Sequence, residues 1–273
     1  MTLLADAAFE VPARPGNASG AVGGRLDAVF RASGAARLEV IRTSSPPLEL
    51  RGPFLDDGGG PARYFLRNVT AGVFGGDRYE VGVRVEAGGR VRIQPTSATR
   101  VYDSRGKVAS LATHLEVLPG ALLEFNAGTT ILQGGASLEQ DTELVVHPGG
   151  ELRYSEVLAL GRRASGERFA FERFASALRA RTAEGGDLYR EAFELLPGAA
   201  RTHLEEAVGG AAVIGTLLLL GGPTKIAPGK LEGDTSVLAG WGTLPGGGVI
   251  VRALGATTEA VARLLEGASR LDV

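Results

Sequence analysis

The chain has 273 residues, 44% of them hydrophobic and 22% charged, which is the balance of a globular protein with a sizeable core. A formal net charge of −2 and a pI near 6.0 exclude the strongly basic surface by which proteins bind nucleic acid or anionic membranes. Because the sequence has no cysteine, disulfide bonds and thiolate chemistry are excluded as well. We find neither a secretion signal nor an apolar run long enough to span a membrane, so we expect a cytoplasmic protein.

Glycine is the unusual residue, with 41 copies beside only 6% aromatic residues. Glycine at this density, without a collagen-like period, indicates many tight turns and therefore many short strands. The segment 78–85, RYEVGVRV, places Tyr79, Val81, Val83 and Val85 on one face and mostly polar residues on the other. This alternation predicts a half-buried strand.

The same strand–turn–strand pattern recurs along the chain. Its turns contain Gly88, Gly120, Gly149 and, with a looser match, Gly185. The turns lie roughly 30–36 residues apart, a period at which successive units can stack and bury their apolar faces on one another. We therefore predict a mainly β, solenoid-like (β-helix-like) stack of short strands. A β-sandwich with similar hairpins would produce the same local signals.

The last quarter of the sequence is of mixed character. We expect a short helix over 197–208, a buried strand over 211–220, a hairpin around the turn at 245–248 and a final helix that begins after Thr257. The chain is thus divided into a β-rich body over 1–196 and a smaller α+β portion over 197–273, packed together as one cooperative unit. We expect the smaller portion to cover one end of the stack, since an open strand edge invites association with other chains.

Residues able to perform chemistry are sparse. The three histidines, His114, His147 and His203, are far apart in the sequence and have no metal-binding spacing. The sequence has no GxSxG motif, and Gly221–Lys225 lacks the order of a phosphate-binding loop. Carboxylates are numerous, but no pair is singled out as a general acid and base. These observations argue against a preformed zinc site and against a nucleotide hydrolase.

Two glycine-containing segments stand out, AGVFGGD at 71–77 and ALGRRASGERF at 159–169. In the first, the Asp77 carboxylate can accept hydrogen bonds from backbone N–H groups of a turn. The second has three interpretations: a phosphorylation motif at Ser165, a phosphate-binding turn, or a loop held by an ion pair between Arg162 and Glu167. From these residues alone, the chain is a β-rich scaffold of unknown function.

Several segments in their order resemble the UreD family, also called UreH, of urease accessory proteins. They are AGVFGGD at 71–77, QPTSATRVY at 94–102, LEF at 123–125 and GRRASGERF at 161–169. The resemblance covers residues 25–181 and extends more faintly to the final helix. It implies a largely β, solenoid-like body with a small helical portion, and it implies an assembly factor that is not an enzyme.

The resemblance also implies partners and a cargo. Family members bind urease apoprotein and the accessory protein UreF, and UreF recruits the GTPase UreG. Homodimerisation within such a complex is compatible with this role. The family assists the delivery of Ni²⁺ into the dinuclear urease site. No tightly bound cofactor is expected, and Ni²⁺ would be held only in transit, because oxygen ligands and water release it more readily than a rigid site of softer ligands.

The family motifs are carried over onto individual positions of this sequence. They are Gly72, Gly75, Gly76 and Asp77 in the first segment, Thr96, Arg100 and Tyr102 in the second, Glu124 in the third, and Gly161, Arg162, Gly166 and Glu167 in the fourth. Arg100 stands where the family usually has lysine. Asp77, Arg162 and Glu167 are our candidates for lining a polar route, while Asp77, Glu167 and His147 are weak candidates for metal ligands. The fourth segment then serves to define a loop geometry rather than to present Ser165 to a kinase.

The sequence departs from the family over Asn126–Thr130, where two prolines usual in the family are missing. Proline restricts φ, so we expect a loop here that is more mobile or differently shaped. The departure leaves open a second function, a β-solenoid binding scaffold without a urease role. A third, a carbohydrate-active β-solenoid enzyme, is suggested by the repeat and the carboxylates, although Trp241 is the only tryptophan available to stack on a sugar.

Overall fold

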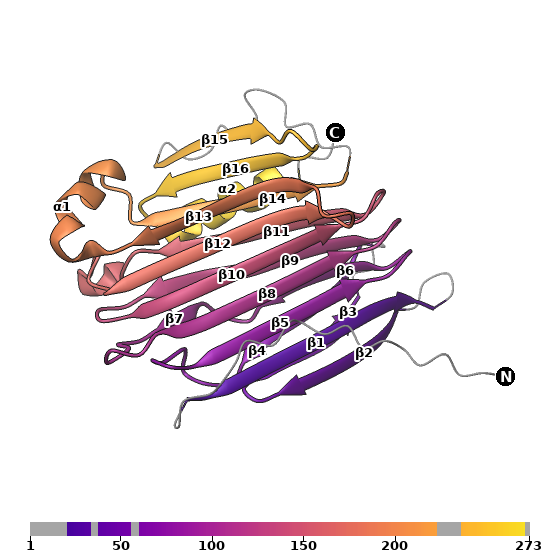
Figure 1. The fold of residues 1–273 in the computed structure, drawn as a ribbon, viewed down its shortest axis with the longest axis horizontal. Helices are drawn as coiled ribbons and strands as arrows, with labels where there is room; N and C mark the ends of the chain where they lie inside the picture. Colours follow the sequence, from indigo (N-terminus) through magenta and orange to yellow (C-terminus); the bar gives the residue numbers. More distant parts are fainter. Residues whose placement is uncertain (1–20, 34–37, 56–59, 223–235, 271–273) are drawn as a thin grey trace.

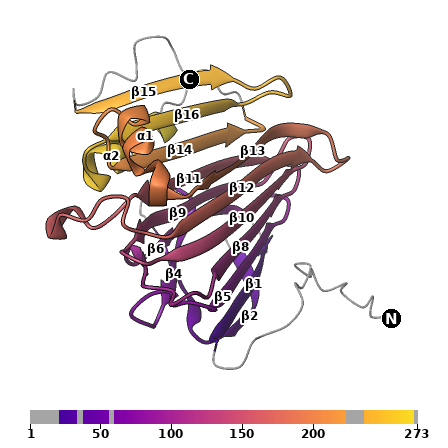
Figure 2. The ribbon, with the colours of Figure 1, turned by 60° about the vertical axis from the view of Figure 1, so that its left-hand side comes forward.

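The computed structural model describes residues 21–33, 38–55, 60–222 and 236–270, which form two layers of β-sheet (Figures 1 and 2). The first sheet has the order β13 (Asp187–Leu195), β12 (Arg173–Thr182), β10 (Ser137–Val146), β8 (Ala109–Val117), β5 (Arg78–Val85), β1 (Gly23–Ala32) and β2 (Leu38–Ser45). The second has the order β15 (Val237–Thr243), β16 (Val249–Gly255), β14 (Val213–Leu220), β11 (Glu151–Ala159), β9 (Leu122–Leu132), β6 (Arg90–Pro95), β4 (Ala62–Asn68) and β3 (Leu48–Phe54), with β7 (Thr99–Val101) also paired to β9.

The middle of the chain alternates between the two sheets, as a solenoid does. After β5 the chain crosses to β6, after β8 to β9 and after β10 to β11, and strands of successive coils pair in parallel. The colours in Figure 1 accordingly advance across the stack in chain order. The predicted mainly β, solenoid-like fold is confirmed.

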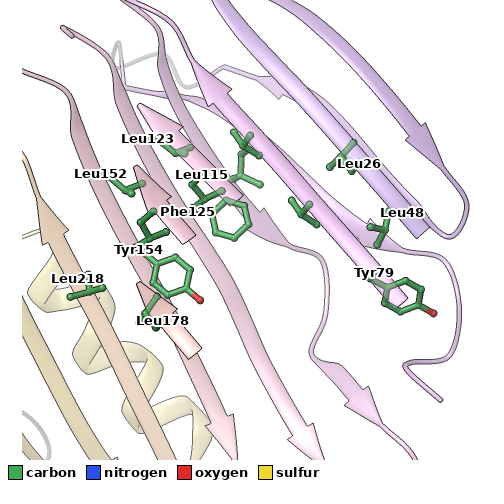
Figure 3. Packing of buried hydrophobic residues seen from close by; sticks show 14 of the residues in the cluster. Leu26, Leu48, Tyr79, Leu115, Leu123, Phe125, Leu152, Tyr154, Leu178 and Leu218 are labelled. Atoms are coloured by element: carbon green, nitrogen blue, oxygen red, sulfur yellow. The ribbon is translucent and has the colours of Figure 1, made fainter. Parts of the chain in front are cut away.

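The register of this pairing places apolar residues in continuous rows. Val83, Leu115, Leu144 and Ala180 are direct neighbours on β5, β8, β10 and β12, and all four are fully buried. The facing row on the second sheet includes Leu123 and Leu152, and Figure 3 shows these side chains gathered between the sheets with Leu115. The alternation predicted for residues 78–85 is confirmed, since Tyr79, Val81, Val83 and Val85 are all buried.

The glycine turns form a ladder at one end of the stack. Gly88, Gly120 and Gly149 have φ between +72° and +78°, a left-handed conformation that glycine adopts without strain. The N–H of Gly88 donates to the carbonyl of Gly120, and the N–H of Gly120 donates to the carbonyl of Gly149, at 3.2 and 2.8 Å. The fourth turn of the predicted repeat, at Gly185, is different: it joins β12 and β13, which are antiparallel neighbours in the same sheet. The chain reverses there instead of crossing, so the solenoid ends before this turn.

The segment 126–130 is not a loop, contrary to the expectation from the missing prolines. It lies inside β9, where the pairing with β11 shifts register beside Ser155. Gly128 has φ of +81° and donates its N–H to the Asn126 side-chain oxygen at 2.7 Å, as expected of a β-bulge. A Cβ at Gly128 would lie 2.4 Å from Pro95 Cγ, so the bulge also lets the neighbouring strand approach closely.

The C-terminal elements continue the second sheet instead of covering its end. Strand β14 pairs antiparallel with β11, and the hairpin of β15 and β16 follows, which leaves β15 as the new edge. Helix α2 (Thr258–Ser269) packs on the face of β14 and β16 through Val261 and Leu265, and Thr257 caps its first turn. Helix α1 (Pro197–Ala207) precedes β14. The division at residues 196 and 197 stays a prediction. No helix in the described ranges is long and apolar enough to cross a membrane.

We predict that Leu144→Ala lowers the free energy of unfolding by about 2–5 kcal/mol, because it leaves a cavity in a fully buried row. Leu55→Ala is the matched control, since Leu55 is 73% exposed, and its effect should stay within about 0.5 kcal/mol. Urea unfolding followed by circular dichroism measures both values. Equal losses for the two variants would contradict the assigned register.

Candidate functional site

The motif segments meet at the end of the stack opposite the glycine ladder. At this end the chain returns from the second sheet to the first through segments 69–77, 102–108, 133–136 and 160–172. Backbone hydrogen bonds join successive segments: Val73 N–H to the Arg100 carbonyl at 2.8 Å, and Ser104 N–H to the Gly135 carbonyl at 2.9 Å. Four segments that together span about 100 residues of sequence therefore form successive layers of one surface, which we call the motif end.

The first motif is a tightly packed turn. A Cβ at Gly72 would lie 2.4 Å from the Arg100 carbonyl oxygen, and one at Gly75 would lie 2.1 Å from the Ser104 carbonyl oxygen. Gly76 is needed for a different reason, since its φ is +89°. The Asp77 carboxylate is 4% exposed and accepts hydrogen bonds from Val22 N–H, Phe74 N–H and the Tyr79 hydroxyl at 2.9–3.1 Å. The predicted role of Asp77 as an acceptor in a turn is confirmed.

The second motif lies against the first. Tyr102 stacks on Phe74 with ring centroids 4.8 Å apart, and its hydroxyl donates to the Ala71 carbonyl. Thr96 and Arg100 are both exposed. Thr96 lies just before β7, and Arg100 lies within it. Arg100 is thus held by its backbone against the first motif, while its side chain is left at the surface.

The fourth motif is a short loop closed by an ion pair. The Arg162 guanidinium contacts both oxygens of Glu167, with Nε 2.8 Å from Oε2, which confirms the predicted pair. Their hydrogen bond lowers the pKa of Glu167 from its usual value and raises the pKa of Arg162 from its usual value. Gly166 ends a 3₁₀ turn with φ of +69°, and a Cβ at Gly161 would lie 2.4 Å from the Glu167 carbonyl oxygen.

One layer of the motif end was not anticipated from the sequence. Segment 133–136 lies between the second and fourth motifs, and the N–H of Gly134 points to Glu167 Oε2 at 3.4 Å. Buried Ser104 and Ser137 join the same layers through a 2.7 Å hydrogen bond. The paired glycines at 134 and 135 were the available signal, but they resemble many other turns in this glycine-rich chain.

The remaining predicted residues lie elsewhere. Glu124 is on the outer face of the second sheet, 2.5 Å from Arg92 and 3.5 Å from Arg153. His147 is in the glycine ladder at the opposite end, with Nε2 2.8 Å from Glu116. The weak metal candidates Asp77, Glu167 and His147 are therefore not brought together. Within the described ranges, no three His, Cys, Asp or Glu side chains form a group able to hold a metal ion.

A cavity of about 300 Å³ extends between the sheets from the motif end. Its outer lining includes the exposed residues Thr70, Thr96 and Arg100, and its inner lining includes buried Thr142 and Tyr154. Neutral polar side chains line much of its length: Asn68, Thr70, Thr96, Ser97, Thr99, Thr113, Thr130, Gln140 and Thr142. Asp77, Arg162 and Glu167 are not among the lining residues, although the first and second motifs border its opening through Gly72 and Arg100.

Ionisable groups are found beyond the inner end of this cavity. A small adjoining space of about 20 Å³ shares Thr130 and Gln140 with it and is lined by Glu156 and Arg252. Glu156 accepts hydrogen bonds from the Tyr154 hydroxyl at 2.8 Å and from Gln140 at 2.6 Å. Burial raises the pKa of Glu156, and these two hydrogen bonds oppose the shift only in part. The cavity thus leads from an exposed opening that carries Arg100 to the half-buried carboxyl group of Glu156.

Comparison with known proteins gives this arrangement a context. The model of the family described as "UreD urease accessory protein" matches residues 22–271. This chain belongs to that family. A UreD urease accessory protein of Haloarcula marismortui is 32% identical over 216 residues, which cover 75% of this chain and 70% of the relative. One from Sorangium cellulosum is 32% identical and covers 87% and 76% of the two chains, and one from Cenarchaeum symbiosum is 25% identical and covers 89% and 88%. The resemblance to the UreD family is confirmed.

Within this UreD fold, we predict that two glycines of one motif differ in their tolerance of a side chain. Gly161→Ala should lower the free energy of unfolding by more than about 2 kcal/mol, because the new Cβ meets the Glu167 backbone. Gly166→Ala should cost about 1 kcal/mol, since its left-handed φ opposes the substitution while no atom of the described residues lies within 4 Å of the Cβ position. Chemical denaturation of the two variants tests this order, and the reverse order would contradict the described loop.

A second prediction concerns pH. A raised pKa means that native Glu156 binds its proton more tightly than the unfolded chain does, so stability falls as pH rises from the ordinary value of 4.5 through the raised pKa. Glu156→Gln removes this dependence. We expect the variant to gain stability relative to the wild type between pH 4 and pH 7, as measured by urea unfolding at both pH values. A stability difference that does not change with pH would contradict the shift.

Proposed function

We propose that this chain is a nickel–urease assembly factor. It acts as a non-catalytic scaffold that binds urease apoprotein and the UreF and UreG accessory proteins, and it assists the transfer of Ni²⁺ into the dinuclear urease site. Its membership of the UreD family supports the urease role, because the relatives described above carry the name urease accessory protein. The more specific steps rest on the family resemblance of the motifs.

The cavity is the observation that carries the proposal. Its opening is bordered by two of the family motifs, through Gly72 and Arg100, and its lining is rich in hydroxyl and amide oxygens. Such oxygens, together with ordered water, can exchange places around a hydrated Ni²⁺ ion without retaining it, which is what a route requires. We propose that Ni²⁺ passes through this cavity as cargo and that Glu156 contacts it near the inner end.

In this proposal, the motif end contributes by shaping the opening of the cavity. Its stacked segments hold the opening in one shape, and Asp77 and the Arg162–Glu167 pair contribute by closing turns. Asp77→Asn and Glu167→Gln test whether these carboxylates also belong to the route. If both variants leave urease activation intact at normal protein levels, the two residues serve only the architecture of the loops.

The two other functions considered gain no support from a specific observation. The loss of two prolines motivated a scaffold without a urease role, but the affected segment is an ordered, bulged strand. The carbohydrate-active alternative rested on the repeat and the carboxylates, and many of those carboxylates are paired with arginine on the outer faces of the sheets.

The proposal predicts complex formation and nickel transfer. Tagged protein is co-purified from cells that also express the cognate UreF, UreG and urease subunits, and nickel content and urea hydrolysis are measured on the same material. We expect a stable complex and nickel-loaded urease only when this chain is present. Equal urease activity in its absence, without a complex, would remove the urease role.

Filling the cavity tests the route separately. Thr113 lines the cavity from β8, and Thr113→Phe should reduce urease nickel content at least tenfold while the complex still forms. Ala170→Phe is the control, because it adds the same side chain at an exposed position of the motif end. Normal nickel loading with a stably folded Thr113→Phe variant would exclude the cavity as the route but would leave the scaffold role in place.

A further inference from the structure

The four edge strands of the two sheets are not alike. Strands β2 and β13 end the first sheet, and β3 and β15 end the second. Three of them carry the charges or proline that discourage pairing with another chain. These residues are Glu39 and Arg42 on β2, Glu49, Arg51 and Pro53 on β3, and Asp187, Arg190, Glu191 and Glu194 on β13. Strand β15, with the sequence VLAGWGT, has neither charge nor proline.

The outer edge of β15 presents backbone groups in a defined pattern. The N–H of Leu244 donates to the Gly248 carbonyl at 3.0 Å at the hairpin turn. Because hydrogen-bonding direction alternates along a strand, the even-numbered residues of β15 face β16. The N–H and C=O groups of Val237, Ala239, Trp241 and Thr243 therefore point outward, and no described strand pairs with them.

Neither backbone conformation nor packing within the described chain requires glycine at positions 240 and 242 of β15. Neither Gly240 nor Gly242 has a positive φ. Among the described residues, a Cβ at Gly240 would have no neighbour within 4 Å, and one at Gly242 would have its nearest neighbour at 4.0 Å. On the adjacent strand, a Cβ at Gly255 would lie 2.6 Å from Val261, so that glycine is explained by packing. Glycine weakens a strand interior and often marks a site where another chain approaches.

We propose that β15 pairs antiparallel with β15 of a second copy of this chain, about a two-fold axis at Gly240. In this register the large residues of each copy face small ones of the other: Leu238 faces Gly242, and Trp241 faces Ala239. The Leu238 and Trp241 side chains are 74% and 38% exposed in one copy and become covered by the pairing. The space above the two glycines receives the Leu238 side chain of the second copy.

Hydrogen bonding supports the same register. Ala239 of one copy and Trp241 of the other both direct their N–H and C=O groups outward, so they can exchange two hydrogen bonds. A shift of two residues in either direction places Trp241 opposite Trp241 or opposite Val237, which brings two bulky side chains together. The symmetric contact is self-complementary, as a two-fold interface must be.

The proposed dimer does not depend on the proposed function. No residue of β15 lines the cavity, and the motif segments lie at the ends of other strands. The second sheet would continue from one copy into the other while both cavities keep their openings. Failure of urease activation would therefore leave this inference standing, and failure of dimerisation would leave the assembly role standing.

Sedimentation equilibrium of the purified full chain over a range of concentrations tests the pairing. We expect a monomer–dimer equilibrium, and we expect Leu238→Lys to weaken it at least tenfold, since a charge would be placed against an apolar strand. Ile41→Lys is the matched control: it adds the same charge at a 45% exposed residue of the β2 edge and should leave the equilibrium unchanged. A wild-type protein that is monomeric throughout, or a dimer insensitive to Leu238→Lys, would overturn the proposal.

Disulfide trapping tests the register. The chain has no cysteine, so Gly240→Cys introduces a single thiol, and the two copies of residue 240 face each other on the axis. A directly opposed pair of this kind has its Cα atoms about 4.5 Å apart, within reach of a disulfide. Mild oxidation should yield a covalent dimer of Gly240→Cys and not of Ile41→Cys. Equal cross-linking of both variants, or none of Gly240→Cys, would overturn the assigned axis.

Discussion

Parallel pairing of strands from successive coils is the constraint on which the rest of the structure depends. It places Val83, Leu115, Leu144 and Ala180 side by side, so that each coil buries its apolar face against the next as well as across the two sheets. The same register aligns the turns at Gly88, Gly120 and Gly149 into a hydrogen-bonded ladder. Because the rows must match in every coil, one residue of slippage would expose a whole face.

At the other end of the stack, this register converts separate sequence motifs into one surface. Glycines at positions 72, 75 and 161 permit backbone approaches that any Cβ would prevent, and the Arg162–Glu167 pair closes the outermost loop. Between the sheets, next to the packed core, lies a cavity whose lining mixes threonine and glutamine with leucine, valine and aromatic side chains. The closely packed rim of the cavity and its partly polar lining are thus two results of one stacking pattern.

The features of the fold that the sequence predicted correctly are those that depend on residues close together in the chain. Alternation over 78–85, the glycine turns and the Thr257 cap each depend on neighbouring residues, and each was found as predicted. The errors arose where local signals are ambiguous. The turn at Gly185 looks like the other turns but reverses the chain within one sheet, and Asn126–Thr130 has the composition of a loop but forms a β-bulge. Composition does not distinguish these cases, because the choice is made by the strand that lies alongside.

By itself, the sequence determined the mainly β class, the positions of most turns, the ion pair of the fourth motif and the membership of a family. Only the tertiary structure decided that Gly134 lies between two motifs, that Glu156 meets Tyr154 and Gln140 beyond a cavity, and that β15 is the uncharged edge. The physical reason is the same for all three. They depend on contacts between residues far apart in the chain, and such contacts are set by strand order and register rather than by local propensity.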